Sequence, residues 1–172
     1  MKSYKQSTYE TCLAVCLMNL LEIIPTRKKE IEIWKHGWNF NFLSGQLNYI
    51  AKKYKKNLSL IIDNKYYAKK LSEELLKNIH LSSQNVTVPF LENLVNENFV
   101  ILYMDNFYLQ RIVHYPHFVL ITGQTGGNFI ITDSWDGTIK MIDKKIVKKS
   151  ILSLKKNLGF SPLVITEQKN TP

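Results

Sequence analysis

The chain has only two cysteines, few arginines and no long apolar run. Cys12 and Cys16 lie four residues apart, so on a helix they would share a face where a disulfide between them is strained. We interpret them as free thiols in a reducing compartment. No CxxC or HxxxH spacing accompanies them, so a metal site is not expected. No apolar run reaches membrane-spanning length and no secretory signal is evident, which predicts a cytoplasmic protein without a membrane segment of its own.

A formal net charge of +9 comes mainly from scattered lysines rather than from a concentrated basic stripe. A nucleic-acid binder more often shows such a stripe, or an aromatic platform among base-contacting residues. We therefore do not predict a nucleic-acid partner. With 172 residues and 45% hydrophobic content, the chain has the size of one well-buried domain, which we assign to residues 1–172.

Helical patterns dominate the first part of the chain. Apolar periodicity predicts helices over residues 10–24, 27–36, 44–55 and 65–79, with a short strand at 58–62 between the last two. Residues 82–88 are interpreted as a polar connection. A further helix is predicted over 89–96, where Pro89 suits a first helical turn.

The later part of the chain changes to strand patterns. Strands are predicted at 99–104, 117–123, 128–133, 138–142 and 161–166, with a helix over 144–154 and an irregular, aromatic loop over 105–116. A glycine turn joins the strands at 117–123 and 128–133 as a hairpin. The predicted class is α+β, with an N-terminal helical half packed on a C-terminal antiparallel sheet.

Cys12 stands where a polar segment gives way to the first apolar helix. The unpaired N–H groups and positive dipole of a helix start favour a thiolate and can hold an oxyanion. Gln6, six residues earlier, offers a second oxyanion donor through its side-chain amide. His117 opens one strand of the hairpin and Asp133 closes the next, so both are expected at one sheet edge. These four residues meet the needs of thiol acyl transfer: nucleophile, base, orienting acid and oxyanion donor.

The same residues resemble a known family. Gln6, Cys12, Cys16, the run His117-Phe-Val-Leu, and Ile-Thr-Asp133 with Gly137 soon after look like the C39 cysteine peptidases, papain-like domains that process double-glycine leader peptides and are often fused to peptide exporters. The resemblance implies a papain-like fold and a cysteine peptidase without cofactor. Its implied partners are a peptide or protein substrate, such as a double-glycine leader, and a peptide exporter.

Carried over to this chain, the resemblance makes Cys12 the nucleophile, His117 the general base and Asp133 the residue that orients the imidazole. Gln6 becomes the oxyanion donor. Two positions depart from the family pattern, because Leu13 stands where glycine commonly follows the nucleophile and Ser134 where proline often follows the aspartate. Leu13 is large enough to narrow the approach to Cys12.

Alternative interpretations remain open at several positions. Cys12 can be an inert core cysteine, as we expect Cys16 to be, since free cysteine packs like a small hydrophobe. His114 competes with His117 as the base, and Asp136 is the local substitute for Asp133. An aromatic cluster at Trp38, Phe40 and Phe42 lines either a substrate groove or the core, and Trp135 either walls the site or packs on the sheet.

The chemistry also leaves two alternatives to peptide hydrolysis. One is an acyltransferase of the transglutaminase kind, since the acceptor is selected by the pocket and not by the triad. The other is a catalytically silent module of the same fold that binds peptides.

Overall fold

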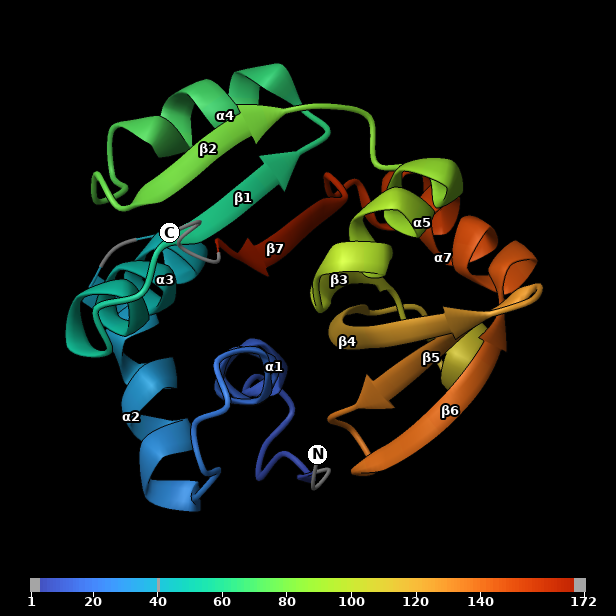
Figure 1. Ribbon diagram of the computed structural model, residues 1–172, viewed down its shortest axis with the longest axis horizontal. Coiled ribbons are helices and arrows are strands. Elements are labelled where there is room, and N and C mark those ends of the chain that lie inside the picture. Colours follow the sequence, from blue (N-terminus) through green and yellow to red (C-terminus); the bar gives the residue numbers. More distant parts are fainter. Residues whose placement is uncertain (1–3, 40, 169–172) are drawn as a thin grey trace.

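The computed structural model describes residues 4–39 and 41–168, and within them seven strands form one sheet in the order β2-β1-β7-β3-β4-β5-β6 (Figure 1). All neighbouring strands of that sheet pair antiparallel except β1 and β2, which are parallel. The strands are β1 (Leu58–Ile62), β2 (Ile79–Ser83), β3 (Val100–Asp105), β4 (Pro116–Thr125), β5 (Asn128–Asp133), β6 (Thr138–Asp143) and β7 (Leu163–Glu167).

Helices cover both faces of the sheet. The first group is α1 (Cys12–Leu20), α2 (Arg27–His36), the short 3-10 turn η1 (Gly37–Asn39), α3 (Phe42–Lys53) and α4 (Lys65–Ser72). The second group is α5 (Val88–Glu97), α6 (Phe107–Gln110) and α7 (Lys144–Leu158). Figure 1 shows α1 end-on, with α2 and α3 beside it and with α5 and α7 across the sheet from it.

Strand β4 separates two hydrophobic clusters. Successive side chains of a strand point to opposite faces. Phe118 and Leu120 accordingly join the cluster around α1, whereas Val119 and Ile121 join the one beneath α5 and α7. Because every residue of α1 is buried, this helix runs through the interior and carries its first residue, Cys12, to the sheet.

The α+β class is confirmed, and several elements agree with the sequence patterns. Helix α2, strand β1 and strand β5 have the predicted bounds, and α5, β3, β4, β6, α7 and β7 differ from prediction only at their ends. The aromatic loop at 105–116 also contains the short helix α6. Phe40 lies outside the described residues.

The prediction for residues 65–88 was wrong in part. Helix α4 ends at Ser72, and residues 79–83 form strand β2 instead of the end of a helix and a polar connection. β2 is an edge strand that pairs only with β1 on the described sheet, so it tolerates the polar residues His80, Ser82 and Ser83, which made its sequence unlike that of a typical strand.

Among the described residues, no helix has the length and apolar character needed to cross a membrane.

Candidate active site

Cys12 is the first residue of α1 and is 8% exposed. The residue before it, Thr11, does not cap the helix with its side chain. Its hydroxyl donates instead to the Glu30 carboxylate on α2. The start of α1 therefore keeps its backbone N–H groups available to the sulfur or to a bound group.

His117 and Asp133 meet at the end of the β4–β5 hairpin. The ring atom Nε2 of His117 donates to Oδ1 of Asp133 at 2.9 Å, and both residues are buried. Because Asp133 accepts this bond, the proton sits on Nε2 of the neutral ring. The other ring atom, Nδ1, makes no hydrogen bond among the described residues, and the charge of the ring acts on the Cys12 thiol, whose pKa it lowers.

The electrostatics of Cys12 and His117 match a proton-sharing pair. Burial alone would raise the pKa of the Cys12 thiol, but the neighbouring His117 ring and its charge outweigh burial and lower the pKa. Burial alone would lower the pKa of His117, but the hydrogen bond to Asp133 and the neighbouring Cys12 thiol raise it to about 9. Both shifts favour a thiolate beside an imidazolium.

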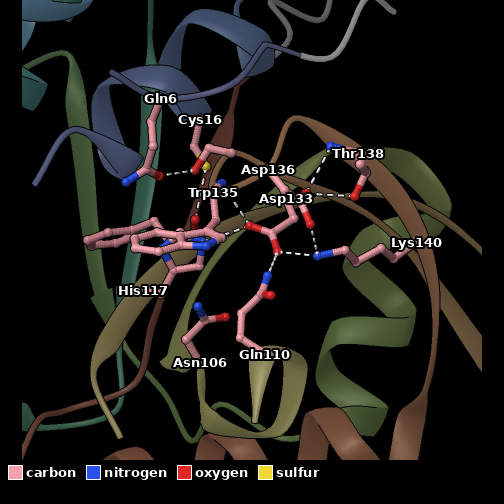
Figure 2. Close-up of polar contacts among 12 residues, drawn as sticks. Gln6, Cys16, Asn106, Gln110, His117, Asp133, Trp135, Asp136, Thr138 and Lys140 are labelled. Carbon is pink, nitrogen blue, oxygen red and sulfur yellow. Dashed lines mark hydrogen bonds and ion pairs between the residues drawn. The ribbon is translucent and has the colours of Figure 1, made fainter. Parts of the chain in front are cut away.

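Asp133 is held by more than His117. Figure 2 shows its carboxylate between His117, Gln110 and Lys140: Oδ2 accepts from Gln110 Nε2 at 2.8 Å and from Lys140 Nζ at 2.7 Å. The backbone N–H of Trp135 donates to Oδ1 at 2.9 Å. Burial would raise the pKa of Asp133, but the bond to His117, its charge and the Lys140 contact hold that pKa well below its usual range.

Lys140 and Gln110 were not identified from the sequence. Thr138 of strand β6 is paired with Asp133 of strand β5. Lys140 lies two residues after Thr138 on the same face of β6, so its long side chain can reach Asp133 diagonally across the two strands. The Asp136-Gly137 turn signal already implied that register, so Lys140 was within reach of sequence reasoning. Gln110 comes from α6, inside a segment predicted to be irregular, and no local pattern indicated it.

Gln6 lies beside the site and is tied to Ser134. Its backbone N–H donates to the Ser134 carbonyl at 2.7 Å, and the Ser134 hydroxyl donates to Gln6 Oε1 at 2.8 Å. The amide nitrogen donates to the Thr8 carbonyl at 2.7 Å. An amide NH₂ carries two donors, so one N–H remains available after the Thr8 contact.

A buried carboxylate that sequence reasoning missed organises the segment before Cys12. Glu30 accepts from the Tyr4 hydroxyl at 3.0 Å, from the backbone N–H and hydroxyl of Ser7 at 2.6 Å each, and from Thr11. A fully buried glutamate needs such donors. Its position in a charged helical segment gave no signal, because the four contacts arise only when residues 4–11 fold against α2.

The competing residues are occupied elsewhere. Cys16 is 1% exposed; its thiol donates to the Phe118 carbonyl at 3.3 Å, and burial raises its pKa well above the ordinary value. His114 pairs with Asp105 at 2.6 Å and stacks on Phe107. Asp136 accepts from Thr138 and pairs with Lys140, which leaves Asp133 as the acid next to His117.

A groove of about 480 Å³ opens at Cys12. Its walls are mostly aromatic and include Tyr9, Trp38, Phe42, Tyr103, Pro116 and Phe118. A second hollow of about 400 Å³ shares Phe42, Tyr103 and Phe118 with the first and is lined by Leu13 as well. Leu13 is thus buried in the wall of the second hollow and is not among the residues lining the groove at Cys12.

Trp135 lies among aromatic neighbours at the same site. Its ring centroid is 4.9 Å from that of Tyr9 and 5.6 Å from that of Tyr115, which in turn packs against His117. The His117–Asp133 pair next to these rings is buried. The described residues contain no group of three or more His, Cys, Asp or Glu side chains arranged as metal ligands.

Comparison with known proteins gives a structural likeness. The chain is similar to the crystal structure of a putative C39-like peptidase from Bacillus anthracis, with a TM-score of 0.52 and 12% sequence identity, over 99% of this chain and 96% of that one. At this identity the likeness establishes a shared C39-like α+β fold. No protein-family model and no curated protein sequence matches the chain.

Proposed function

We propose that the chain, as a single domain over residues 1–172, is a cysteine peptidase of the C39-like kind with Cys12 as its nucleophile. The observation that supports it most directly is the hydrogen bond from His117 Nε2 to Asp133, on a buried ring that lies close enough to the Cys12 thiol to lower its pKa. An inert core cysteine has no need of a buried imidazole with a raised pKa beside it. The fold shared with a C39-like peptidase supports the same proposal.

The proposed reaction has two stages. The Cys12 thiolate attacks the carbonyl carbon of a peptide bond, forming a C–S bond while the carbonyl oxygen becomes an oxyanion. The free N–H of Gln6 and a backbone N–H at the start of α1 donate to that oxyanion. The imidazolium of His117 gives its Nδ1 proton to the leaving amine as the C–N bond breaks. His117 then removes a proton from water as the water attacks the thioester, and the C–S bond breaks to release the carboxylic acid and to restore the Cys12 thiolate beside protonated His117.

Within this proposal, Asp133 is a positioning residue. Its bond to Nε2 fixes the ring so that Nδ1 faces the sulfur, and its charge stabilises the imidazolium. Lys140 and Gln110 hold the second carboxylate oxygen and so prevent Asp133 from rotating away from His117. The family resemblance extends the proposal to a cytoplasmic role in processing a leader peptide, in association with a peptide exporter.

Cys12 and Cys16 provide a matched test, because both are buried on α1 and one helical turn apart. We expect the unmodified chain to cleave the mixed peptides obtained by digesting denatured casein. We also expect iodoacetamide to alkylate it at Cys12, and mass spectrometry follows both reactions. Cys12→Ala should abolish both signals, whereas Cys16→Ala should retain both.

Alkylation that tracks Cys16, or peptide cleavage that survives Cys12→Ala, contradicts the proposal. An added primary amine distinguishes hydrolysis from acyl transfer, because a transferase converts the new carboxyl terminus into an amide. Products that carry only a free carboxylate support the peptidase.

A further inference from the structure

Aromatic side chains surround the proposed nucleophile with their rings turned to solvent. Tyr9 is 79% exposed and Trp38 is 70% exposed, and both line the groove at Cys12. Phe42 and Phe160 are also exposed and line the adjoining hollow. Exposed apolar groups gathered in a concave place mark a binding surface, since single exposed hydrophobic residues are normally scattered.

These rings are held in place by neighbours. Trp38 packs edge-on against Trp34 with 5.4 Å between ring centroids, and Tyr9 packs against Trp135. Tyr103 stacks on Phe118 at 4.3 Å across the floor shared by the groove and the hollow. The walls therefore exist before a ligand arrives, which lowers the entropy cost of binding one.

Glycine makes room for the ring of Phe42. A Cβ atom on Gly37 would lie 2.8 Å from Cδ2 of Phe42 and 2.9 Å from the Phe42 carbonyl oxygen. Without that atom, Phe42 packs directly on the backbone between α2 and α3. The ring can thereby serve as a wall of both the groove and the hollow.

We propose that this groove binds a large apolar or aromatic side chain of the substrate, at a position within one or two residues of the bond that is cut. The inference rests on the proposed function, because Cys12 itself lines the groove. Glycine residues on both sides of the bond would leave the aromatic walls exposed to water and would gain nothing from them. The groove therefore favours residues such as Phe, Tyr, Leu or Met, so any leader peptide that this chain cuts should differ from the double-glycine leaders that the family resemblance implies.

Charge adds a second element of selectivity. Glu10 is the charged residue among the described residues that line the groove. An acidic substrate side chain in the same place would lose hydration without a cationic partner and would face a carboxylate. Aspartate and glutamate next to the cut bond should be disfavoured more strongly than glycine.

The test uses synthetic peptides of one fixed sequence with an internal variable pair. The residue before and the residue after one central bond are each varied among Phe, Leu, Gly and Glu. Mass spectrometry then gives the position of each cut and the kcat/KM for each peptide. We expect kcat/KM to be at least about tenfold higher with Phe or Leu than with Gly at the preferred position. Equal rates, or a preference for Gly-Gly, overturn the inference.

Variants locate the preference in the groove. Trp38→Ala and Phe42→Ala should each lower the Phe-to-Gly ratio of kcat/KM severalfold, whereas Tyr66→Ala should leave it unchanged. Tyr66 is a suitable control because it is an exposed aromatic residue on α4 and lines neither the groove nor the adjoining hollow. An unaltered ratio in both groove variants contradicts the assignment.

Alkylation separates failure of this inference from failure of the proposed function. Iodoacetamide is too small to need the aromatic walls, so Cys12 should react at similar rates in all of these variants. Reactive Cys12 with no side-chain preference in cleavage overturns only the groove. Absence of cleavage for every peptide overturns the peptidase itself.

Discussion

His117 lies between a carboxylate and a thiol, and the charges on these three groups determine the pH range in which the site can react. The pKa of Cys12 is lowered and the pKa of His117 is raised to about 9. Between these two values the residues exist as a thiolate and an imidazolium. Acidification through the lower value protonates the nucleophile, and a pH above about 9 removes the proton that the leaving amine needs.

The pH dependence of the site follows from these directions. We expect kcat/KM for a cleaved peptide to fall as the pH rises through about 9, and alkylation of Cys12 by iodoacetamide to begin at a lower pH than that of an ordinary thiol. In His117→Ala the thiol loses its partner while staying buried, so alkylation should require a pH above about 8.5, the ordinary thiol value. A labelling profile that is the same in both proteins would show that His117 does not act on Cys12.

Ser134 offers a test of Gln6 that leaves the nucleophile intact. Its hydroxyl holds Gln6 Oε1 and thereby orients the amide nitrogen. We expect Gln6→Ala to lower kcat by about 100-fold to 1000-fold, the usual cost of an oxyanion donor. Ser134→Ala should lower it less, by about tenfold, because the backbone bond to Gln6 persists.

Alkylation by iodoacetamide is the control for both variants, since displacement of iodide forms no oxyanion. Its rate should be unchanged while kcat falls. A kcat that is unaffected by Gln6→Ala would remove Gln6 from the mechanism, and slowed alkylation would indicate a general disturbance of α1 instead.

At the scale of elements, the packing of α2 against α3 depends on a glycine. A Cβ atom on Gly45 of α3 would lie 2.2 Å from the His36 carbonyl oxygen at the end of α2. No flexible side chain can absorb that contact, because the blocking atom belongs to the backbone. The two helices would have to move apart. Trp38 lies in the connection between α2 and α3, and Phe42 is the first residue of α3, so both would be displaced as well.

Gly45→Ala should therefore destabilise the chain by about 1–3 kcal/mol, as is typical of overpacking. Urea unfolding followed by circular dichroism measures this change. Gly127→Ala is the matched control, because an added Cβ there meets nothing within 4 Å, and its effect should stay within about 0.5 kcal/mol. Equal stability of the two variants would contradict a tight contact between α2 and α3.

Helices and strands with a strong apolar periodicity could be predicted from the sequence. An element that is recognisable only from the strand it pairs with, such as β2, could not. The bounds of α2, β1 and β5 followed from apolar spacing and turn residues. β2 was missed because an edge strand carries polar side chains on a pattern that resembles a connection. Cys12, His117 and Asp133 were predicted as site residues from their places at element ends, and Gln6 from its spacing before Cys12. Glu30 acquires its contacts only from the tertiary fold.

At the scale of the whole molecule, the candidate site joins segments that are distant in the sequence. α1 comes from the start of the described chain, and β4 and β5 come from its last third. Hydrophobic burial on both faces of β4 holds them together. The sequence predicted that strands and helices would coexist, but it did not predict that β7 lies between β1 and β3, because strand order depends on packing and not on local pattern.

That position of β7 has a consequence for how the protein is made. Leu163–Glu167 is the last strand of the described chain to leave the ribosome, yet it bonds to β1 on one side and to β3 on the other. Until it emerges, the nascent chain carries two separate sheet fragments with open edges, which are prone to pair with other chains. Closure of the sheet therefore waits until β7 has been synthesised, and a chaperone that shields those edges would raise the yield of folded protein.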